Sequence, residues 1–319
     1  MFGKTRVPAP VVAPKVLVIN FAPVFPDQGG KRLYEVLGWN DPRDLMPQYI
    51  ADIEACSYGY VRYRIVEMID VDAYPLKLDG FRYTNATYIA CHEGEEAWHQ
   101  PDAVDYAAIF KAYKIPWRVM LGEVDEVWLW GFPYGGFWES TMAGGQPYFC
   151  NSEPVPGFWG FRTFVTMGFN YERGVGEMLE AFGHRLESIM RHVYGSWELV
   201  PVAQQSTPHA WNRFTLYDKV APGEAACGNV HFAPNSERDY DWGNRRTVMS
   251  SADDWLNYPD LTGAKKPMNC AQWGNGDIRE HHRWWLKRIP HAPGRAADGK
   301  LNNWWPYIVD FNRFPESKK

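Results

Sequence analysis

The stretch Lys15–Phe21 (KVLVINF) is an almost unbroken run of apolar residues. A run of this kind, without polar alternation, is typical of a strand that is covered on both faces, as in a parallel sheet with helices on either side. Glu126–Trp130 (EVWLW) repeats the pattern and leads directly into the glycine-rich segment Gly131–Gly136 (GFPYGG). We therefore predict two buried strands of one sheet, with a tight turn after the later strand.

The sequence that follows the first run predicts a helix and a second strand. Asp44 is placed to cap a helix that continues to about Cys56, and Gly59 is placed to end that helix. Tyr60–Val71 is rich in Val, Ile and Tyr, which favours a strand.

Two further helices complete the pattern. A short one is expected to begin at Asp102 or Asp105 and to end near Tyr113, and a long one covers about residues 173–194. Strands and helices that alternate at these spacings predict an α/β fold, with a mainly parallel sheet flanked by helices. After the long helix the chain becomes a loop-rich aromatic C-terminal half.

The domain organisation follows from composition. Residues 1–14 form a Pro/Val-rich segment, which we interpret as a linker. Residues 15–319 are predicted to form a single α/β domain, and a boundary near residue 200 is the alternative. A linker of this kind is typical of exported proteins, so we expect a secreted, extracellular location.

The charge and hydropathy exclude two classes of partner. The net charge of −5 and the pI near 6.0 argue against a nucleic-acid partner, because nucleic-acid binders carry a basic face. The most apolar segment, Val16–Phe25, is shorter than the roughly 18 residues of a membrane helix. We therefore expect no membrane partner. The oligomeric state is not readable from the sequence.

Aromatic residues are unusually frequent, with 16 Trp, 18 Tyr and 17 Phe. Three explanations remain open: an aromatic core, flat surfaces on which sugar rings stack, or a protein interface. Sugar stacking would use Tyr134 and Trp138 near the glycine-rich turn, and Asn303, Trp304 and Trp305 near the C-terminus. These five residues are the predicted substrate-binding residues.

The long helix, Gly174–Tyr194, separates its side chains into two sets on opposite sides. The apolar set is Val175, Met178, Leu179, Phe182, Leu186, Ile189, Met190 and Val193, and the polar set is Glu177, Glu180, His184, Glu187 and Arg191. The polar set is either a solvated face or a face that loops cover. Its three carboxylates and the absence of Lys favour the covered face. Gly176 and Gly183, which lie together beside it, indicate the close approach of another segment or of a ligand.

A covered row of carboxylates predicts acid–base chemistry. Glu177, Glu180 or Glu187 would act on a glycosidic bond together with Glu139, which follows the strand Glu126–Trp130, and His184 would lie at the centre of the site. Open α/β sheets place their sites beyond the carboxyl ends of their strands, which is where Glu139 is expected.

A metal ion is the second explanation. His184 and Glu187 form an H-x-x-E pair, which places two ligands on one side of a helix, and His231 or His209 would add a third. Zinc is the ion that this set favours. Calcium is a separate option in the loop that carries Asp239, Asp241 and Asn244, or near residues 253–254.

Other patterns in the sequence are less informative. The five cysteines form no C-x-x-C pair, and Cys227 and Cys270 are the preferred pair if a disulfide forms. His281 and His282 are expected to be exposed, while the two tryptophans that follow them pack against the sheet. Ser140 lies in no G-x-S-x-G motif, and the chain has neither G-x-G-x-x-G nor a Walker motif, which argues against a serine hydrolase and a nucleotide enzyme.

Three segments carry a resemblance. Glu123–Ser140, Met167–Gly174 (MGFNYERG) and Gly183–Arg185 (GHR) resemble a group of tryptophan-rich extracellular proteins of bacteria and fungi. The resemblance implies export and no particular activity.

Together these observations predict an exported hydrolase that acts on a polysaccharide or glycoconjugate by carboxylate acid–base chemistry. The alternatives are a metal-dependent (zinc) hydrolase or peptidase that uses His184, Glu187 and His231, and a non-catalytic carbohydrate-binding module.

Overall fold

The computed structural model describes residues 11–314, and by their contacts these residues form two compact units. The sheet unit comprises Pro14–Tyr49 and Arg64–His192. The loop-rich unit comprises Ile50–Tyr63, Val193–Lys319 and Met1–Ala13, as far as these are described. The prediction of a single domain stays a prediction.

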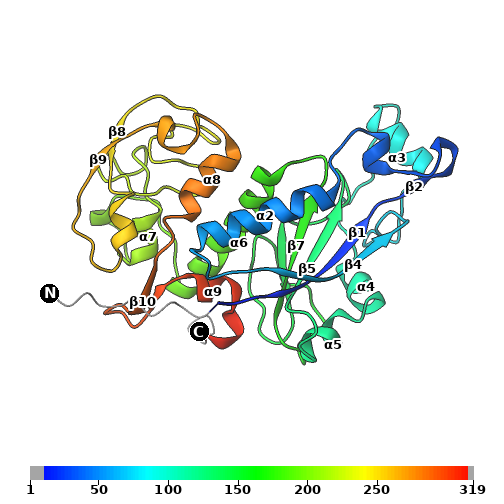
Figure 1. Ribbon diagram of the computed structural model, residues 1–319, viewed down its shortest axis with the longest axis horizontal. Coiled ribbons are helices and arrows are strands. Elements are labelled where there is room, and N and C mark those ends of the chain that lie inside the picture. The colour runs from blue at the N-terminus through cyan, green and yellow to red at the C-terminus, as the bar shows by residue number, and fades with distance from the viewer. Residues whose placement is uncertain (1–10, 315–319) are drawn as a thin grey trace. The chain divides into compact units, whose positions relative to one another are not determined.

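The sheet unit is built on a five-stranded sheet with the order β4-β1-β5-β7-β6 (Figure 1). The strands are β4 (Arg64–Val71), β1 (Lys15–Phe21), β5 (Glu126–Gly131), β7 (Phe164–Asn170) and β6 (Ser140–Ala143). The first four pair in parallel, and β6 pairs with β7 antiparallel. The predicted α/β fold with a mainly parallel, helix-flanked sheet is confirmed.

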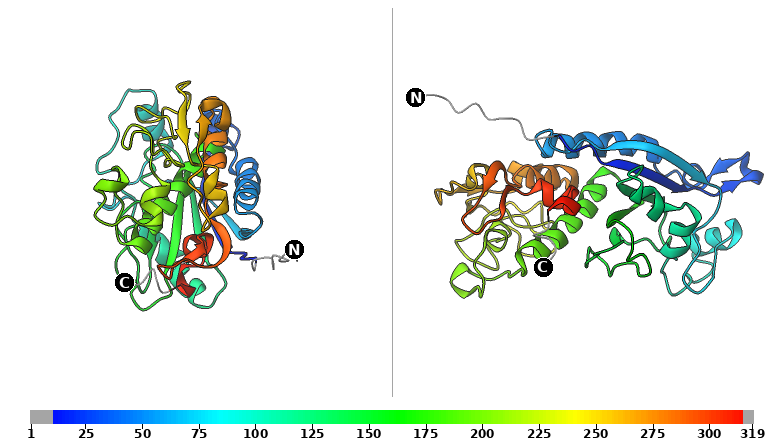
Figure 2. Two further views of the ribbon diagram at one scale, coloured as in Figure 1. Left: turned by 90° about the vertical axis from the view of Figure 1, so that its left-hand side faces the viewer. Right: turned by 90° about the horizontal axis from the view of Figure 1, so that it is seen from below.

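Helices cover both faces of this sheet (Figure 2). On one face Tyr49 of α2 (Pro42–Cys56) packs on Trp128 and Phe169, with ring centroids 5.3 and 5.4 Å apart, and meets Phe182 of α6 (Val175–Tyr194) at 6.4 Å. On the other face Phe110 packs on Phe164 at 5.2 Å. Such pairs add about 0.5–1.5 kcal/mol each beyond the area that they bury.

Local hydrogen bonds explain where the predicted elements begin. Helix α2 begins at Pro42 because the carboxylate of Asp41, and not that of Asp44, accepts a hydrogen bond from the Arg43 N–H at 2.8 Å. Helix α4 (Tyr106–Ala112) follows Asp105, whose carboxylate accepts from the Ala108 N–H at 2.8 Å.

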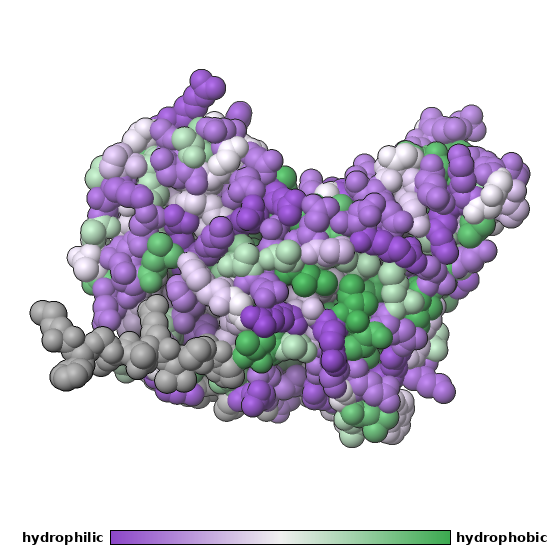
Figure 3. All heavy atoms as spheres, viewed as in Figure 1, coloured by the Kyte–Doolittle hydropathy of each residue, from purple (hydrophilic) through white to green (hydrophobic). Residues whose placement is uncertain are grey.

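The smaller elements of the sheet unit connect these layers. They are β2 (Val24–Phe25), η1 (Pro26–Gln28), β3 (Lys31–Arg32), α1 (Leu33–Val36), α3 (Asn85–His92) and α5 (Ile115–Met120). Around α5 the side chains of Trp117, Met120 and Leu121 are exposed and form an apolar area of the surface (Figure 3).

The loop-rich unit has short elements only. They are η2 (Val202–Gln204), α7 (Ala210–Phe214), β8 (Val248–Ser250), η3 (Asp254–Asn257), β9 (Lys266–Met268), η4 (Cys270–Trp273), α8 (Ile278–Leu286), β10 (His291–Arg295), β11 (Leu301–Asn303), α9 (Trp305–Val309) and η5 (Phe311–Arg313). Strands β8 and β9 form one antiparallel pair, and β10 and β11 form another. The core of this unit is formed mainly by packed aromatic side chains.

Trp304 lies at the centre of that core. Its ring packs against Trp211 at 6.0 Å, Phe214 at 5.5 Å and Trp255 at 6.1 Å. Trp304 and Trp305 are both 0% exposed, so neither ring offers a face to a ligand. The sequence-based assignment of these two residues to substrate binding is wrong, because burial of their large apolar area outweighed the polar character of the neighbouring asparagines.

His281 and His282 are also buried, contrary to the prediction that they are exposed. The ring of His281 stacks on that of Trp242 at 5.2 Å, and Nδ1 of His282 lies 2.7 Å from the carbonyl oxygen of Ile278. An imidazole has apolar faces that pack like other aromatic rings once its polar edge is hydrogen-bonded. Trp285 is buried, and its Nε1 donates to the carbonyl oxygen of Gly228 at 3.1 Å; its packing against the sheet stays a prediction.

The cysteines form no disulfide: all five are free and buried. The predicted Cys227–Cys270 pair is therefore wrong. The Sγ atoms of these two residues lie near separate acceptors, the carbonyl oxygen of Ala252 and the side-chain oxygen of Asn275.

The predicted linker lies mostly outside the described residues, because residues 1–10 are not described. Of its remaining part, Val12 pairs with Val61 in a short parallel bridge, and its N–H donates to the carbonyl oxygen of Tyr60 at 2.8 Å. This bridge has the same register as the pairing of Lys15 with Arg64, while the strand β4 itself begins at Arg64 and not at Tyr60 as predicted. Within residues 11–314 no helix combines the length and hydropathy that crossing a membrane requires.

The predicted calcium positions have their oxygens engaged by protein groups. Asp241 Oδ2 accepts from the Glu237 N–H at 3.0 Å and from Asn244 Nδ2 at 2.7 Å. Asp253 pairs with Arg288 and Lys266. The carboxylate of Asp254 accepts from the N–H groups of residues 262 and 263 and from the hydroxyl of Thr262. Nothing in these contacts favours calcium.

The replacement of Asp254 by Asn is expected to lower the free energy of unfolding by about 1–3 kcal/mol at pH 7, because charge-assisted hydrogen bonds are lost. Burial alone would raise the pKa of Asp254, but the bonds from Thr262 and Gly263 outweigh burial and hold the pKa below 3.8. A folded-state pKa below the unfolded value gives stability that is present above pH 3.8 and lost as the pH falls through the folded pKa. Urea denaturation of both proteins at pH 7 and at pH 3 checks this; a gap that stays constant would contradict it.

Candidate functional site

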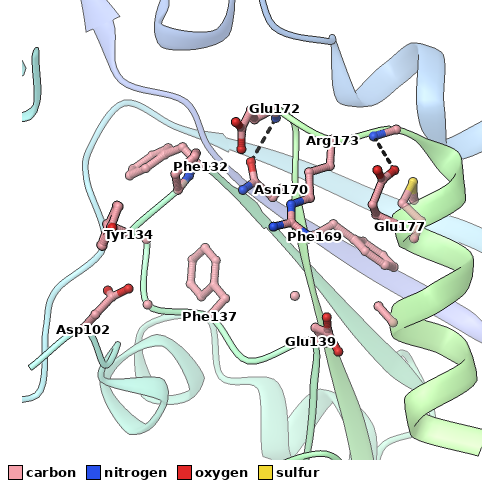
Figure 4. A pocket seen from close by; sticks show the side chains of 17 residues that line it. Asp102, Phe132, Tyr134, Phe137, Glu139, Phe169, Asn170, Glu172, Arg173 and Glu177 are labelled. Carbon is pink, nitrogen blue, oxygen red and sulfur yellow. Dashed lines mark hydrogen bonds between the residues drawn. The ribbon is translucent and has the colours of Figure 1, made fainter. Parts of the chain in front are cut away.

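The sheet unit contains a pocket of about 370 Å³ at the carboxyl ends of β5 and β7 and the beginning of α6 (Figure 4). Its lining residues are Asp102, Phe132, Pro133, Tyr134, Gly135, Gly136, Phe137, Glu139, Gly168, Phe169, Asn170, Glu172, Arg173, Gly174, Glu177, Met178 and Ala181. A parallel sheet is expected to bind its ligand at this edge. Four carboxylates and several aromatic rings therefore face one cavity.

Two glycines allow the wall of this pocket to form. A Cβ atom on Gly168 of β7 would lie 2.3 Å from the carbonyl oxygen of Trp138, and a Cβ atom on Gly131 would lie 2.5 Å from the ring of Phe137. Only glycine lets residues 137–139 cross β7 this closely. The Gly168 N–H donates to the carbonyl oxygen of Glu139 at 3.0 Å, which fixes Glu139 at the edge of the pocket.

The carboxylate of Glu139 is tied to α6 through Asn151. Asn151 Nδ2 donates to Glu139 Oε2 at 2.6 Å, and the Asn151 N–H donates to Ser188 Oγ at 3.0 Å. Ser188 belongs to α6, so the loop that carries Asn151 holds Glu139 in a fixed position beside that helix.

His184 of α6 lies at the centre of a group that we call the α6 cluster: Glu139, Glu180, His184 and Glu187. Nδ1 of His184 is 3.1 Å from Glu187 Oε2, and Nε2 is 3.9 Å from both Glu139 Oε2 and Glu180 Oε1. The side chains of Glu180 and Glu187 are 6% and 8% exposed, whereas that of Glu139 is 43% exposed. The cluster is thus closed on its α6 side, and only Glu139 lines the pocket.

The three carboxylates strongly favour a positive charge at His184. Burial of the imidazole by itself lowers the pKa of His184, but the neighbouring Glu180, Glu187 and Glu139 outweigh burial and raise the pKa from 6.5 to about 10. At neutral pH His184 is therefore expected to hold a proton, and with it a positive charge, within the α6 cluster.

Two members of the α6 cluster, Glu180 and His184, are spaced for a metal ion. Zinc lies about 2.0–2.2 Å from His nitrogen and carboxylate oxygen, so two ligand atoms on one tetrahedral ion are roughly 3.4 Å apart. The 3.9 Å between His184 Nε2 and Glu180 Oε1 is about half an ångström longer, which a small side-chain rotation closes. In this arrangement Glu187 acts on the ring and not on the ion, which differs from its predicted role as a ligand.

Glu177, the remaining acid of the predicted polar face, has a structural role. Its Oε2 accepts from the Gly174 N–H at 3.0 Å, which caps the first turn of α6. It lines the pocket but is not a member of the α6 cluster.

The two histidines predicted as third ligands lie in the loop-rich unit. His209 has both ring nitrogens engaged: Nε2 lies 3.0 Å from Ser196 Oγ, and Nδ1 accepts from the Asn212 N–H at 3.2 Å. The role of His209 as a ligand stays a prediction. His231 forms an ion pair with Asp239 at 3.0 Å, and its role as a ligand stays a prediction.

The predicted substrate-binding residues do not all line the pocket. Tyr134 lines the pocket. Trp138 is 54% exposed but is not among the lining residues, and its N–H donates to the hydroxyl of Tyr106 at 2.6 Å. Asn303 ends β11 in the loop-rich unit, where its side-chain oxygen accepts from the Trp305 N–H at 3.1 Å.

Sequence reasoning missed Asp102, Glu172 and Arg173, which also line the pocket. The last two directly follow β7, a strand that the sequence analysis did not identify. The rule that led to Glu139, which looks beyond the carboxyl end of a parallel strand, would have found them as well.

Comparison of the chain with protein-family models, with curated proteins and with solved structures finds no match. The resemblance to extracellular proteins, and the export that it implies, stay predictions.

Proposed function

We propose that this protein is a metal-dependent hydrolase that cleaves a polysaccharide or glycoconjugate, with the ion held by Glu180 and His184 and with Glu139 beside it. The observation that carries the proposal is the orientation of His184: its Nδ1 is bound by Glu187, and its Nε2 faces the carboxylates of Glu139 and Glu180 beside the pocket.

The hydrogen bonds around His184 and Glu139 support a metal site at the α6 cluster. Metal-binding histidines characteristically use their second nitrogen to hydrogen-bond a carboxylate, which fixes the ring and makes it a stronger ligand. Glu187 supplies that carboxylate at 3.1 Å, and Asn151 donates to Glu139 at 2.6 Å. An imidazole and a carboxylate suit zinc and other divalent ions of the first transition row.

The α6 cluster lies beside the pocket, so a bound ion could act on a substrate held there. Such an ion would supply Lewis acidity towards water and towards a substrate oxygen. Glu139 is the cluster member that lines the pocket, so a substrate held there meets the cluster on that side. Buried Glu180 and Glu187 hold His184 in place and keep its proton or the ion on the Nε2 side.

The second candidate is the metal-free acid–base hydrolase that the sequence predicts. The approach of Glu139 and Glu180 to one imidazole nitrogen favours it, because two carboxylates at close range are the requirement for acid–base cleavage of a glycosidic bond. Activity after removal of metal distinguishes the two. A non-catalytic binding module, the third candidate, releases no reducing ends under either condition.

Titration of chelator-treated protein with Co²⁺ or Zn²⁺ tests the proposal. We expect one ion per chain, and at least about 100-fold weaker binding for Glu180→Gln and His184→Ala because a ligand is lost. Glu187→Gln is expected to weaken binding about 10- to 100-fold through the orientation of the imidazole. Calorimetry gives the affinity, and the visible absorption of Co²⁺ reports its ligands directly.

The matched control is Glu177→Gln, which changes a carboxylate on the same face of α6 outside the cluster; its ion affinity should stay within about threefold of wild type. Far-UV circular dichroism confirms that each variant is folded. Wild-type protein that binds no ion, or folded His184→Ala that binds as tightly as wild type, would contradict the metal site. Full hydrolytic activity in chelator-treated protein would favour the acid–base enzyme instead.

A further inference from the structure

A second group of residues forms the wall of the pocket around Tyr134, apart from the α6 cluster (Figure 4). The ring of Tyr134 stacks on that of Trp98, with centroids 4.1 Å apart and an angle of 9° between the planes. Trp98 is half-buried and does not line the pocket, whereas Tyr134 lines it and is 39% exposed. Trp98 thus supports Tyr134 from behind and leaves a flat aromatic surface on the pocket side.

A fully buried lysine fixes this wall. Nζ of Lys77, whose side chain is 0% exposed, lies 2.5 Å from Asp102 Oδ1 and donates to the carbonyl oxygen of Tyr134 at 2.6 Å. Burial lowers the pKa of Lys77, and the hydrogen bond and charge of Asp102 offset part of that effect. One ammonium group therefore joins the aromatic surface to a carboxylate that also lines the pocket.

The backbone around Tyr134 leaves little freedom for this wall to move. Tyr134 has a left-handed conformation with φ of 59°, and a Cβ atom on Gly136 would lie 2.8 Å from both Lys77 Nζ and the Val104 nitrogen. The Val104 N–H donates to the carbonyl oxygen of Gly136 at 3.1 Å. The hydroxyl of Tyr88 donates to the carbonyl oxygen of Pro133 at 2.9 Å. A rigid wall loses little entropy when a ligand binds, which raises affinity.

We propose that Tyr134 and Asp102 form a subsite for a neutral sugar ring of the substrate. The C–H face of the ring lies on Tyr134, and hydroxyl groups at its rim donate to Asp102, while Lys77 and Trp98 act as positioning residues. This subsite rests on the proposed function in one respect: the sugar is taken to be part of the substrate that is hydrolysed. It extends that function by naming the chemical class that the pocket recognises.

The charge of the wall decides between a neutral and a cationic ligand. Lys77 already balances the negative charge of Asp102, so Asp102 attracts an ammonium or guanidinium group weakly, yet its oxygens still accept hydrogen bonds from hydroxyl groups. A flat aromatic face beside a hydrogen-bond acceptor matches the two surfaces of a sugar ring. The pocket volume of about 370 Å³ lies within the roughly 300–1,000 Å³ that small-molecule sites occupy.

Calorimetric titration of the full chain with hexasaccharides of glucose, xylose, mannose and N-acetylglucosamine, and with a lysine-containing hexapeptide, tests the subsite. We expect at least one hexasaccharide to bind and the peptide not to bind. Tyr134→Asn is expected to weaken saccharide binding at least tenfold, and it adds no backbone strain because Asn tolerates positive φ. Asp102→Asn is expected to weaken binding about three- to tenfold, and Tyr134→Phe to bind within about threefold of wild type.

Tyr113→Ala is the matched control, since Tyr113 lies at the end of α4 outside the pocket lining and should leave binding unchanged. The titrations use chelator-treated protein, so they report on the subsite whether or not the α6 cluster holds an ion or performs hydrolysis. Binding of the peptide, binding of none of the saccharides, or equal saccharide affinity in folded Tyr134→Asn would each overturn the sugar subsite. A failed metal titration with intact saccharide binding would overturn the metal-dependent function alone.

Discussion

Replacing Glu139 by Gln is expected to lower kcat for hydrolysis by about 10²- to 10⁴-fold and to leave KM within about threefold of its wild-type value. Glu139 lines the pocket and also lies 3.9 Å from His184 Nε2, so it joins the substrate space to the α6 cluster. The neutral amide of Gln keeps the size of the side chain but carries no negative charge beside His184 and cannot accept a proton. Both candidate chemistries therefore require the carboxylate.

The measurement is the release of reducing ends from a polysaccharide that the wild-type protein cleaves. Glu153→Gln is the control, because Glu153 is an exposed carboxylate that follows Asn151 and Ser152 in the same loop. If Glu139→Gln keeps more than a tenth of the wild-type kcat/KM, the reaction does not occur at this cluster. A change confined to KM would instead make Glu139 a binding residue.

Replacing Arg185 by Met is expected to lower the free energy of unfolding by about 3–5 kcal/mol, because the substitution leaves the charge of Glu126 buried without its guanidinium. Arg185 Nη1 lies 2.7 Å from Glu126 Oε2, and the two side chains are 0% and 3% exposed. Trp128 Nε1 donates to the other oxygen of Glu126 at 2.9 Å. The pair connects α6 to the first residue of β5 and so helps to hold the helix that carries the cluster.

Urea denaturation followed by circular dichroism gives the free energy of unfolding of this variant. The double variant Glu126→Gln with Arg185→Met should recover at least half of the loss, since it no longer buries an uncompensated charge. A single-variant loss below about 1 kcal/mol would show that the pair contributes little to stability.

The sequence by itself determined the framework of the sheet unit. The apolar runs that became β1 and β5 and the amphipathic pattern that became α6 lie where they were predicted, because burial on both faces of a strand or on one side of a helix leaves a periodicity in the sequence. The same periodicity placed Glu180, His184 and Glu187 on one side of α6. The rule for the carboxyl ends of parallel strands added Glu139.

The tertiary structure alone decided which side chains are buried and which meet. The frequency of tryptophan did not distinguish the buried Trp304 from the exposed Trp138, since residue type does not report burial. The wall of Lys77, Trp98, Asp102 and Tyr134 unites three segments far apart in the chain, and such contacts depend on how loops cross the sheet edge. The distances at His184, and hence the case for a cation there, likewise arise only when β7, the loop of Asn151 and α6 pack together.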